Sequence, residues 1–224
     1  MTQFVKLDFL TLKPYYTSLL MLVGIGVMFS LFLEWAVSGL IMIMVVYLVM
    51  VAGYPFSIGD KANIDMFYTT LPLSRKQVVT GRYLFTLCLY AITILISLAL
   101  IAVAVVVRGN HVEAMEVLYG ISWSFLLFSF MVGVQFPLYF KMGYTKARLL
   151  ANLPLFILGF LAMLGPVILE FTGREDVLSG MLNGFDQAVE SHLGAMLAVP
   201  IVSGAILLAV SLAISRRFHA AKDL

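Results

Sequence analysis

The chain has 224 residues, of which 62% are hydrophobic and 12% are charged, and its formal net charge is +2. A soluble domain is about half apolar and about a quarter charged, so this composition excludes a water-covered globular domain. The apolar runs are long and continuous, without strict alternation. This pattern favours membrane-spanning helices over a β-barrel, because backbone polar groups in hydrocarbon must be satisfied within the segment.

A helix crosses a bilayer with about 20 apolar residues. Runs of this length predict an all-α integral membrane protein with six transmembrane helices. The chain forms a single transmembrane domain (1–224) with spans over 15–33, 35–56, 83–107, 117–140, 149–169 and 195–215. The first run is too long and starts too late for a cleavable signal peptide. Before it, Val5, Phe9 and Leu12 share one helical face, which predicts a short N-terminal interfacial helix, with a frayed tail as the alternative.

Basic residues are distributed unevenly over the connections between these spans. With the N-terminus placed in the cytoplasm, only Arg108 and Arg174 of the 14 basic residues fall on the outer side. An excess of lysine and arginine marks the cytoplasmic side of a membrane protein. We therefore expect both termini in the cytoplasm.

The inner loop over 57–82 is the most informative soluble segment. Asp60 or Asn63 can cap a short helix, and Pro72 ends it because the residue before proline disfavours the helical conformation. Ser74 can cap a second helix that runs through Arg82 into the third span. The apolar face of the short helix contains Ile64, Phe67, Tyr68 and Leu71. Its aromatic residues indicate either a protein partner or insertion into the membrane interface.

Polar residues inside the spans are mild, and most are expected to form hydrogen bonds between helices. Gln135 stands out because Pro137, which is expected to break the fourth span near its end, frees a backbone carbonyl nearby. These two residues are candidates for a pathway or hinge. Ala205, Ala209 and Ala213 form a small-residue stripe that could let helices approach closely.

The outer loop over 170–194 is predicted to be amphipathic. Apolar residues recur there at steps of three and four, which is typical of a helix at the outer membrane interface: Leu178, Met181, Leu182, Phe185 and Val189.

Chemistry-bearing motifs are missing from the sequence. It contains no P-loop pattern, and no ionisable residue lies in the middle of a span, which argues against an ion-coupled pump. His111, His192 and His219 are scattered, so we expect no catalytic residue, no metal site and no cofactor in this chain. The single cysteine, Cys88, lies in an apolar run and is expected to be a buried, inert packing residue. These features favour a channel or transport subunit whose energy comes from elsewhere.

Two inner segments carry a family resemblance. The stretch 71–84 (LPLSRKQVVTGRYL) and the stretch 135–148 (QFPLYFKMGYTKAR) resemble the ends of spans two and four in ABC-2 type transporter permeases. The resemblance implies a six-span half-transporter that pairs with a second, identical or paralogous permease. It also implies a cytoplasmic ABC ATPase subunit, which binds ATP and Mg²⁺ and docks on a coupling helix between spans two and three. The residues implied in docking are Asp65, Met66, Phe67, Tyr68 and Leu71, flanked by Ser74, Arg75 and Lys76.

Among such permeases, the chain most resembles those of antimicrobial or amphipathic peptide exporters, such as phenol-soluble modulin exporters. That resemblance implies an amphipathic peptide cargo and a location in the bacterial inner (plasma) membrane, among lipids and with no nucleic-acid partner. It also implies that the outer amphipathic loop resembles the outer re-entrant helices of ABC-2 exporters, with a surface helix on lipid as the alternative. The rival hypothesis is a non-transporting membrane scaffold or a regulatory or immunity subunit.

Overall fold

The computed structural model describes residues 16–32, 37–61, 75–109, 111–173, 176–177, 179–180, 184 and 192–220, and this part of the chain contains helices and no strands. The helices are α2 (Tyr16–Phe32), α3 (Val37–Ala52), α4 (Tyr54–Lys61), α6 (Arg75–Arg108), α7 (Ala114–Met142), α8 (Tyr144–Phe171) and α10 (Leu193–Ala220). The N-terminal interfacial helix and the apolar residues of the outer amphipathic loop lie outside the described residues.

Five helical stretches of the described chain are long and apolar enough to cross a membrane, and each overlaps one of the expected spans. They are Val37–Gly59, Lys76–Val107, Ala114–Met142, Tyr144–Phe171 and Leu193–Ala220. The shorter α2 has 17 residues and lies where the first span is expected.

The connections at one end of the bundle are shorter than expected from the sequence. Helix α4 continues to Lys61, and α6 begins at Arg75 and runs unbroken through Arg82 into the third span, as predicted. Asp60 lies inside α4, and Asn63, the other expected cap, lies outside the described residues. Helices α7 and α8 are separated only by Gly143, whose positive φ of 80° suits a residue without a side chain and allows the chain to reverse.

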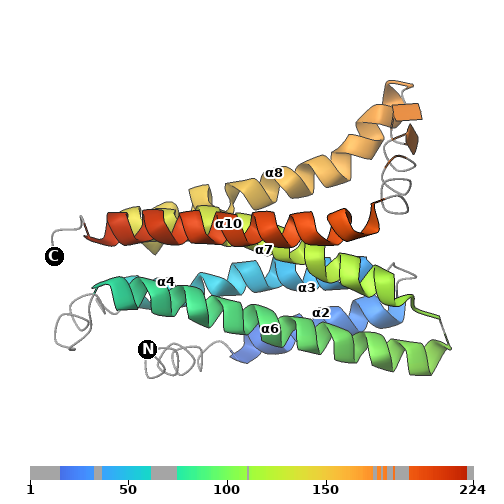
Figure 1. The fold of residues 1–224 in the computed structure, drawn as a ribbon, viewed down its shortest axis with the longest axis horizontal. Helices are drawn as coiled ribbons and strands as arrows, with labels where there is room; N and C mark the ends of the chain where they lie inside the picture. The colour runs from blue at the N-terminus through green and yellow to red at the C-terminus, as the bar shows by residue number, and fades with distance from the viewer. Residues whose placement is uncertain are drawn as a thin grey trace.

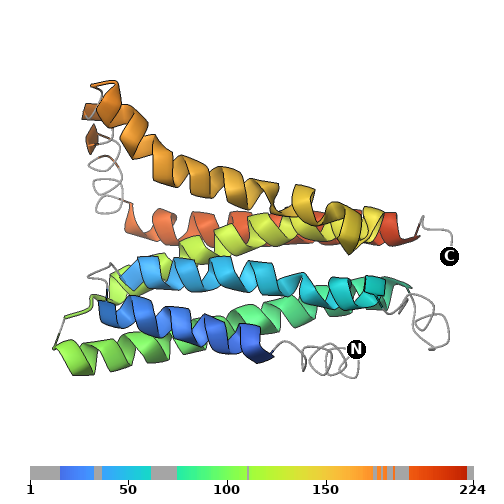
Figure 2. The same ribbon diagram turned by 180° about the vertical axis from the view of Figure 1, so that it is seen from behind.

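Helix α7 occupies the centre of the bundle. It packs against α3, α8 and α10, while α6 packs against α3 and α10, and α2 lies along α3 and α6. Successive long helices run in alternating directions (Figures 1 and 2). The apolar core therefore lies where α3, α6 and α7 meet, and its fully buried members include Ile41, Met44, Phe85, Phe128, Met131 and Phe136.

Helix α8 is attached to the bundle through its first half alone. Its buried residues are Ala147, Ala151 and Leu155, which recur every four residues and so form one ridge on the helix. Beyond them the helix diverges from the bundle (Figure 1), and side chains such as Phe160 are exposed. An apolar helix that is open on all sides is stable only in lipid or against another protein surface.

Exposed charges of the described residues separate between the two ends of the bundle. The first turns of α6 and α8 and the last turns of α7 and α10 meet at one end, which we call the basic end. Its exposed basic side chains are Lys76, Lys141, Lys146, Arg148, Arg216 and Arg217. The opposite end holds Glu113 and Glu170, and also Arg108 at the end of α6.

Cys88 does not lie in the core. The prediction of a buried packing residue is wrong, because the Cys88 side chain is exposed on α6. Helical periodicity explains the error: its neighbour Leu89 is on the buried face, and an unbroken apolar run does not show which face of a helix meets lipid.

Candidate functional site

Two of the eight expected docking residues, Arg75 and Lys76, lie in the described part of the chain, at the basic end of the bundle. The other six lie in the segment 62–74, outside the described residues: Asp65, Met66, Phe67, Tyr68, Leu71 and Ser74. Arg75 and Lys76 open α6, and the Lys76 side chain is exposed. The structure therefore brings the two stems of this segment, α4 and the start of α6, to the same end as the exposed basic residues.

Gly53 makes the break between α3 and α4. Its carbonyl accepts hydrogen bonds from the backbone N–H groups of Phe56 and Ser57, which start the new helix. A Cβ atom at Gly53 would lie 3.1 Å from Cε2 of Tyr144 and 3.4 Å from the hydroxyl oxygen of Tyr139. The absence of a side chain therefore lets the tyrosines of α7 and α8 pack directly on this break.

An aromatic cluster joins α4 to the end of α7. The ring centroid of Phe56 lies 5.0 Å from those of both Phe136 and Phe140 and 5.1 Å from that of Tyr139. The two phenylalanine contacts are edge-to-face, the arrangement that aromatic quadrupoles favour. Movement of α4 relative to α7 would break all three contacts together.

Pro137 lies inside α7 and does not end it, contrary to the expected break. The helix continues to Met142, and the carbonyl that the proline leaves without its usual donor accepts a hydrogen bond from another helix. That carbonyl belongs to Gly133, and the Ser211 hydroxyl of α10 donates to it at 3.0 Å. The proline therefore creates an attachment point between two helices.

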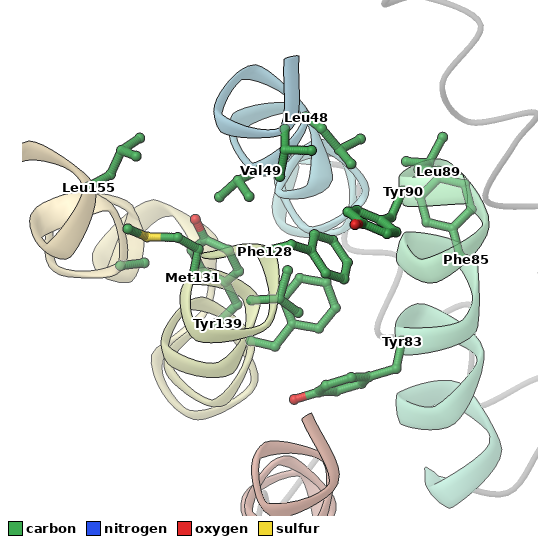
Figure 3. Close-up of a cluster of buried hydrophobic side chains, with 14 of the residues drawn as sticks. Leu48, Val49, Tyr83, Phe85, Leu89, Tyr90, Phe128, Met131, Tyr139 and Leu155 are labelled. Carbon is green, nitrogen blue, oxygen red and sulfur yellow. The ribbon is translucent and has the colours of Figure 1, made fainter. Parts of the chain in front are cut away.

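Tyr83 extends this attachment to α6. Its hydroxyl oxygen lies 2.6 Å from Oγ of Ser211 and 2.9 Å from Oγ of Ser215. In Figure 3 the Tyr83 ring crosses from α6 between α7 and α10, with the hydroxyl toward α10. Hydroxyl groups thus connect α6, α7 and α10 in a region where few other polar partners exist.

Gln135 connects α7 to α8. Its Nε2 donates to Oδ1 of Asn152 at 3.0 Å, and Nδ2 of Asn152 donates to the backbone carbonyl of Arg148 at 2.7 Å. The Gln135 side chain is fully buried, and its Oε1 has no hydrogen-bond partner among the described residues. These hydrogen bonds hold the first half of α8, which packs on the bundle, against α7. A role of Gln135 and Pro137 in a pathway or hinge stays a prediction.

The alanine stripe of the last span lies on an exposed face of α10. Ala205, Ala209 and Ala213 are exposed, and the close approach of α10 to α7 occurs instead at Gly204. A Cβ atom there would lie 3.0 Å from Cδ1 of Phe125 and 3.0 Å from Oγ of Ser129. A single glycine is a weaker sequence signal than a periodic stripe, and the sequence reading missed it.

Arg82 is the other residue that the sequence reading missed. It was counted only as one more cytoplasmic basic residue, yet its side chain is 5% exposed. Its guanidinium carbon lies 4.5 Å from the centroid of the Phe56 ring. A signal was present in the sequence: Arg82 directly precedes the third span, inside the helix that Ser74 is expected to cap.

The fold and this site define a multi-pass helical membrane protein in which α4 and the start of α6 meet at a basic end, on either side of residues 62–74. Within the described residues, no group of three or more histidine, cysteine, aspartate or glutamate side chains could hold a metal ion. The chain belongs to the ABC-2 family of transporter proteins, which it matches over residues 3–219. It is a membrane permease of the ABC transporter type, and the family implies association with an ABC ATPase. No curated protein and no solved structure matches the chain.

Proposed function

We propose that this chain is the permease subunit of an ATP-driven exporter, that it pairs with a second permease, and that it docks separate ATPase subunits. The family match over 217 consecutive residues, from 3 to 219, carries the proposal. ATP and Mg²⁺ bind to the ATPase, and the permease contributes the path through the membrane. The second permease is identical or paralogous.

In this proposal the chain has six spans, and the basic end faces the cytoplasm. Helix α2 is the first span, because its 17 mostly apolar residues lie within the run over 15–33, which is close to the length that a bilayer needs. The exposed lysines and arginines of the basic end support this orientation in a bacterial inner membrane. Both termini then lie in the cytoplasm.

The coupling segment, which we define as residues 62–74, docks the ATPase. Its stems support this role, because α4 and α6 hold the ends of the segment at the basic end. Asp65 to Leu71 fill the groove of the ATPase, and Ser74, Arg75 and Lys76 flank it. The cargo is an amphipathic or antimicrobial peptide, which fits the apolar surfaces that α8 and α10 leave exposed.

Retention of ATPase tests the docking assignment. The tagged chain is purified from its native membrane, and the bound P-loop ATPase is quantified with a photoreactive ATP analogue. Phe67→Ala combined with Tyr68→Ala is expected to lower the retained ATPase about tenfold or more, as the loss of central aromatic anchors does. Phe171→Ala is the control, because Phe171 is 92% exposed at the opposite end. Equal retention in both variants contradicts the docking assignment.

Thiol labelling on intact cells tests the orientation. Cys88 is first replaced by serine, and a cysteine is then introduced at Phe67. A membrane-impermeant maleimide is expected to label this cysteine only after the cells are opened. Labelling of intact cells would place the coupling segment outside the cell and would contradict the proposal.

A further inference from the structure

Arg82 is a charged side chain buried among helices. Burying a charge is costly unless other groups compensate it, so a buried arginine is held by its surroundings. Nη2 lies 3.9 Å from the position that a Cβ atom would take at Gly59 of α4. Gly59 lies one turn beyond Phe56, whose ring the guanidinium covers. Arg82 of α6 therefore lies across one face of α4.

The two helices that Arg82 brings together are the two stems of the coupling segment. Phe56 is the α4 member of the aromatic cluster with α7, and its ring is the surface on which Arg82 lies. Tyr83, next to Arg82, packs its ring 4.9 Å from Phe136 of α7 in an edge-to-face contact. Both stems thus reach the same side chain, Phe136, one residue before Pro137.

The chemistry of arginine suits this position. A guanidinium is planar and permanently charged, so it can lie flat on an aromatic face and keep its attraction to the ring. Lysine would supply a charge without the flat contact, and glutamine would supply neither the charge nor the cation–π attraction. Comparing the lysine and glutamine variants therefore distinguishes the contribution of the charge from that of the flat contact with the ring.

We propose that Arg82 is a positioning residue that clamps α4 to α6, so that a displacement of the coupling segment reaches α7 and α10 as one movement. The proposal rests on the proposed function, because the displacement comes from the docked ATPase. Without the clamp, α6 could follow the coupling segment while α4 stays on α7. ATP hydrolysis would then continue without moving the bundle.

Hydrogen exchange of the purified chain in lipid nanodiscs tests the clamp without any ATPase. Arg82→Gln is expected to speed exchange of the amides of Tyr54–Lys61 about tenfold, and Arg82→Lys is expected to speed it less. Phe56→Leu is expected to speed it at least as much as Arg82→Gln, because it also removes the ring contacts of Phe56 with α7. The effect of the double variant Phe56→Leu with Arg82→Gln should fall well short of the sum of the two single effects, because either change alone already removes the contact between the guanidinium and the ring. Arg217→Gln is the control, since Arg217 is exposed on α10. Unchanged exchange in α4, or fully additive effects, would overturn the clamp.

The complex with ATPase tests the transmission of movement. The readout is the change in ATP hydrolysis rate that the permease causes in nanodiscs, compared with the amount of ATPase retained. The Arg82→Gln variant should retain an amount of ATPase within about twofold of the wild type. The change in hydrolysis rate that this variant causes should be about tenfold smaller than with the wild type, and Arg82→Lys should restore part of it. Retained ATPase with an unchanged response would overturn the transmission role. If the wild-type chain retains no ATPase, the proposed function and the transmission role both fail, while the exchange experiment still decides the clamp.

Discussion

Replacing Ser211 by alanine tests how the bundle tolerates a proline in its central helix. Pro137 has no N–H group, so the carbonyl of Gly133 depends on the Ser211 hydroxyl as its donor. The same hydroxyl group bonds the Tyr83 hydroxyl at 2.6 Å. Ser211→Ala removes both interactions with only one atom changed, and Ser211 is itself buried.

The expected cost follows from these two losses. Leaving a buried carbonyl without a donor costs about 1–3 kcal/mol. A hydrogen bond between membrane helices contributes about 0.6 kcal/mol on average. Together they predict that Ser211→Ala lowers the free energy of unfolding by about 2 kcal/mol. For a chain of this size, that corresponds to a fall in Tm of roughly 4–8 °C.

Thermal unfolding in detergent or nanodiscs measures this cost. Ser203→Ala is the matched control on the same helix, because the Ser203 hydroxyl donates only to the carbonyls of Val199 and Pro200 within α10. It should change Tm by about 2 °C or less, the shift that about 0.5 kcal/mol produces. In the background of Pro137→Ala, which restores an N–H group to α7, Ser211→Ala should cost markedly less. Equal costs for both serines, or a cost that Pro137→Ala leaves unchanged, would refute the reasoning.

Two further variants probe the contacts of α7 by the same unfolding measurement. Gln135→Leu should cost about 1 kcal/mol, because Asn152 loses the donor that binds its Oδ1; no loss would show that this bond does not hold α8. Gly204→Val should cost about 1–3 kcal/mol by overpacking against Phe125, while Gly159→Ala, with no atom within 4 Å of its Cβ position, should be nearly neutral. Equal effects of the two glycine substitutions would contradict the packing of α10 on α7.

The helices were predictable because their cause is local. Each long span needs only enough consecutive apolar residues to cross hydrocarbon, and a sequence displays that directly. The continuation of α6 back to Arg75 was predictable for a similar reason, since no proline or glycine pair interrupts the stretch after Ser74. Charge counting likewise anticipated that exposed basic residues would gather at one end, where the last turns of α7 and α10 now place Lys141 and Arg216.

The faces of the helices were not predictable, because they depend on which helices become neighbours. In a soluble protein, the apolar side of a helix shows which face is buried, but a membrane helix is apolar all round. This is why the prediction of a buried Cys88 is wrong, and why the sequence pointed to the alanine stripe for a close approach of helices that occurs at Gly204. The burial of Arg82 needed still more information, namely that the chain turns at Gly53 and that α4 brings Phe56 against α6.

The contacts between helices are unevenly distributed: α4, α6, α7 and α10 are connected to one another as a block, whereas α8 packs against this block through its first half alone. The hydroxyl groups of Tyr83 and Ser211 connect α6, α7 and α10, and the aromatic contact between Phe56 and Phe136 connects α4 to α7. Helix α8 is held at one end, by its Ala147–Leu155 ridge and the bond of Asn152 to Gln135. In lipid no hydrophobic force draws its outer half back to the bundle, since lipid tails are as apolar as the helix. Only close packing can hold that half in place, so the surface that covers it determines where α8 stands relative to the block.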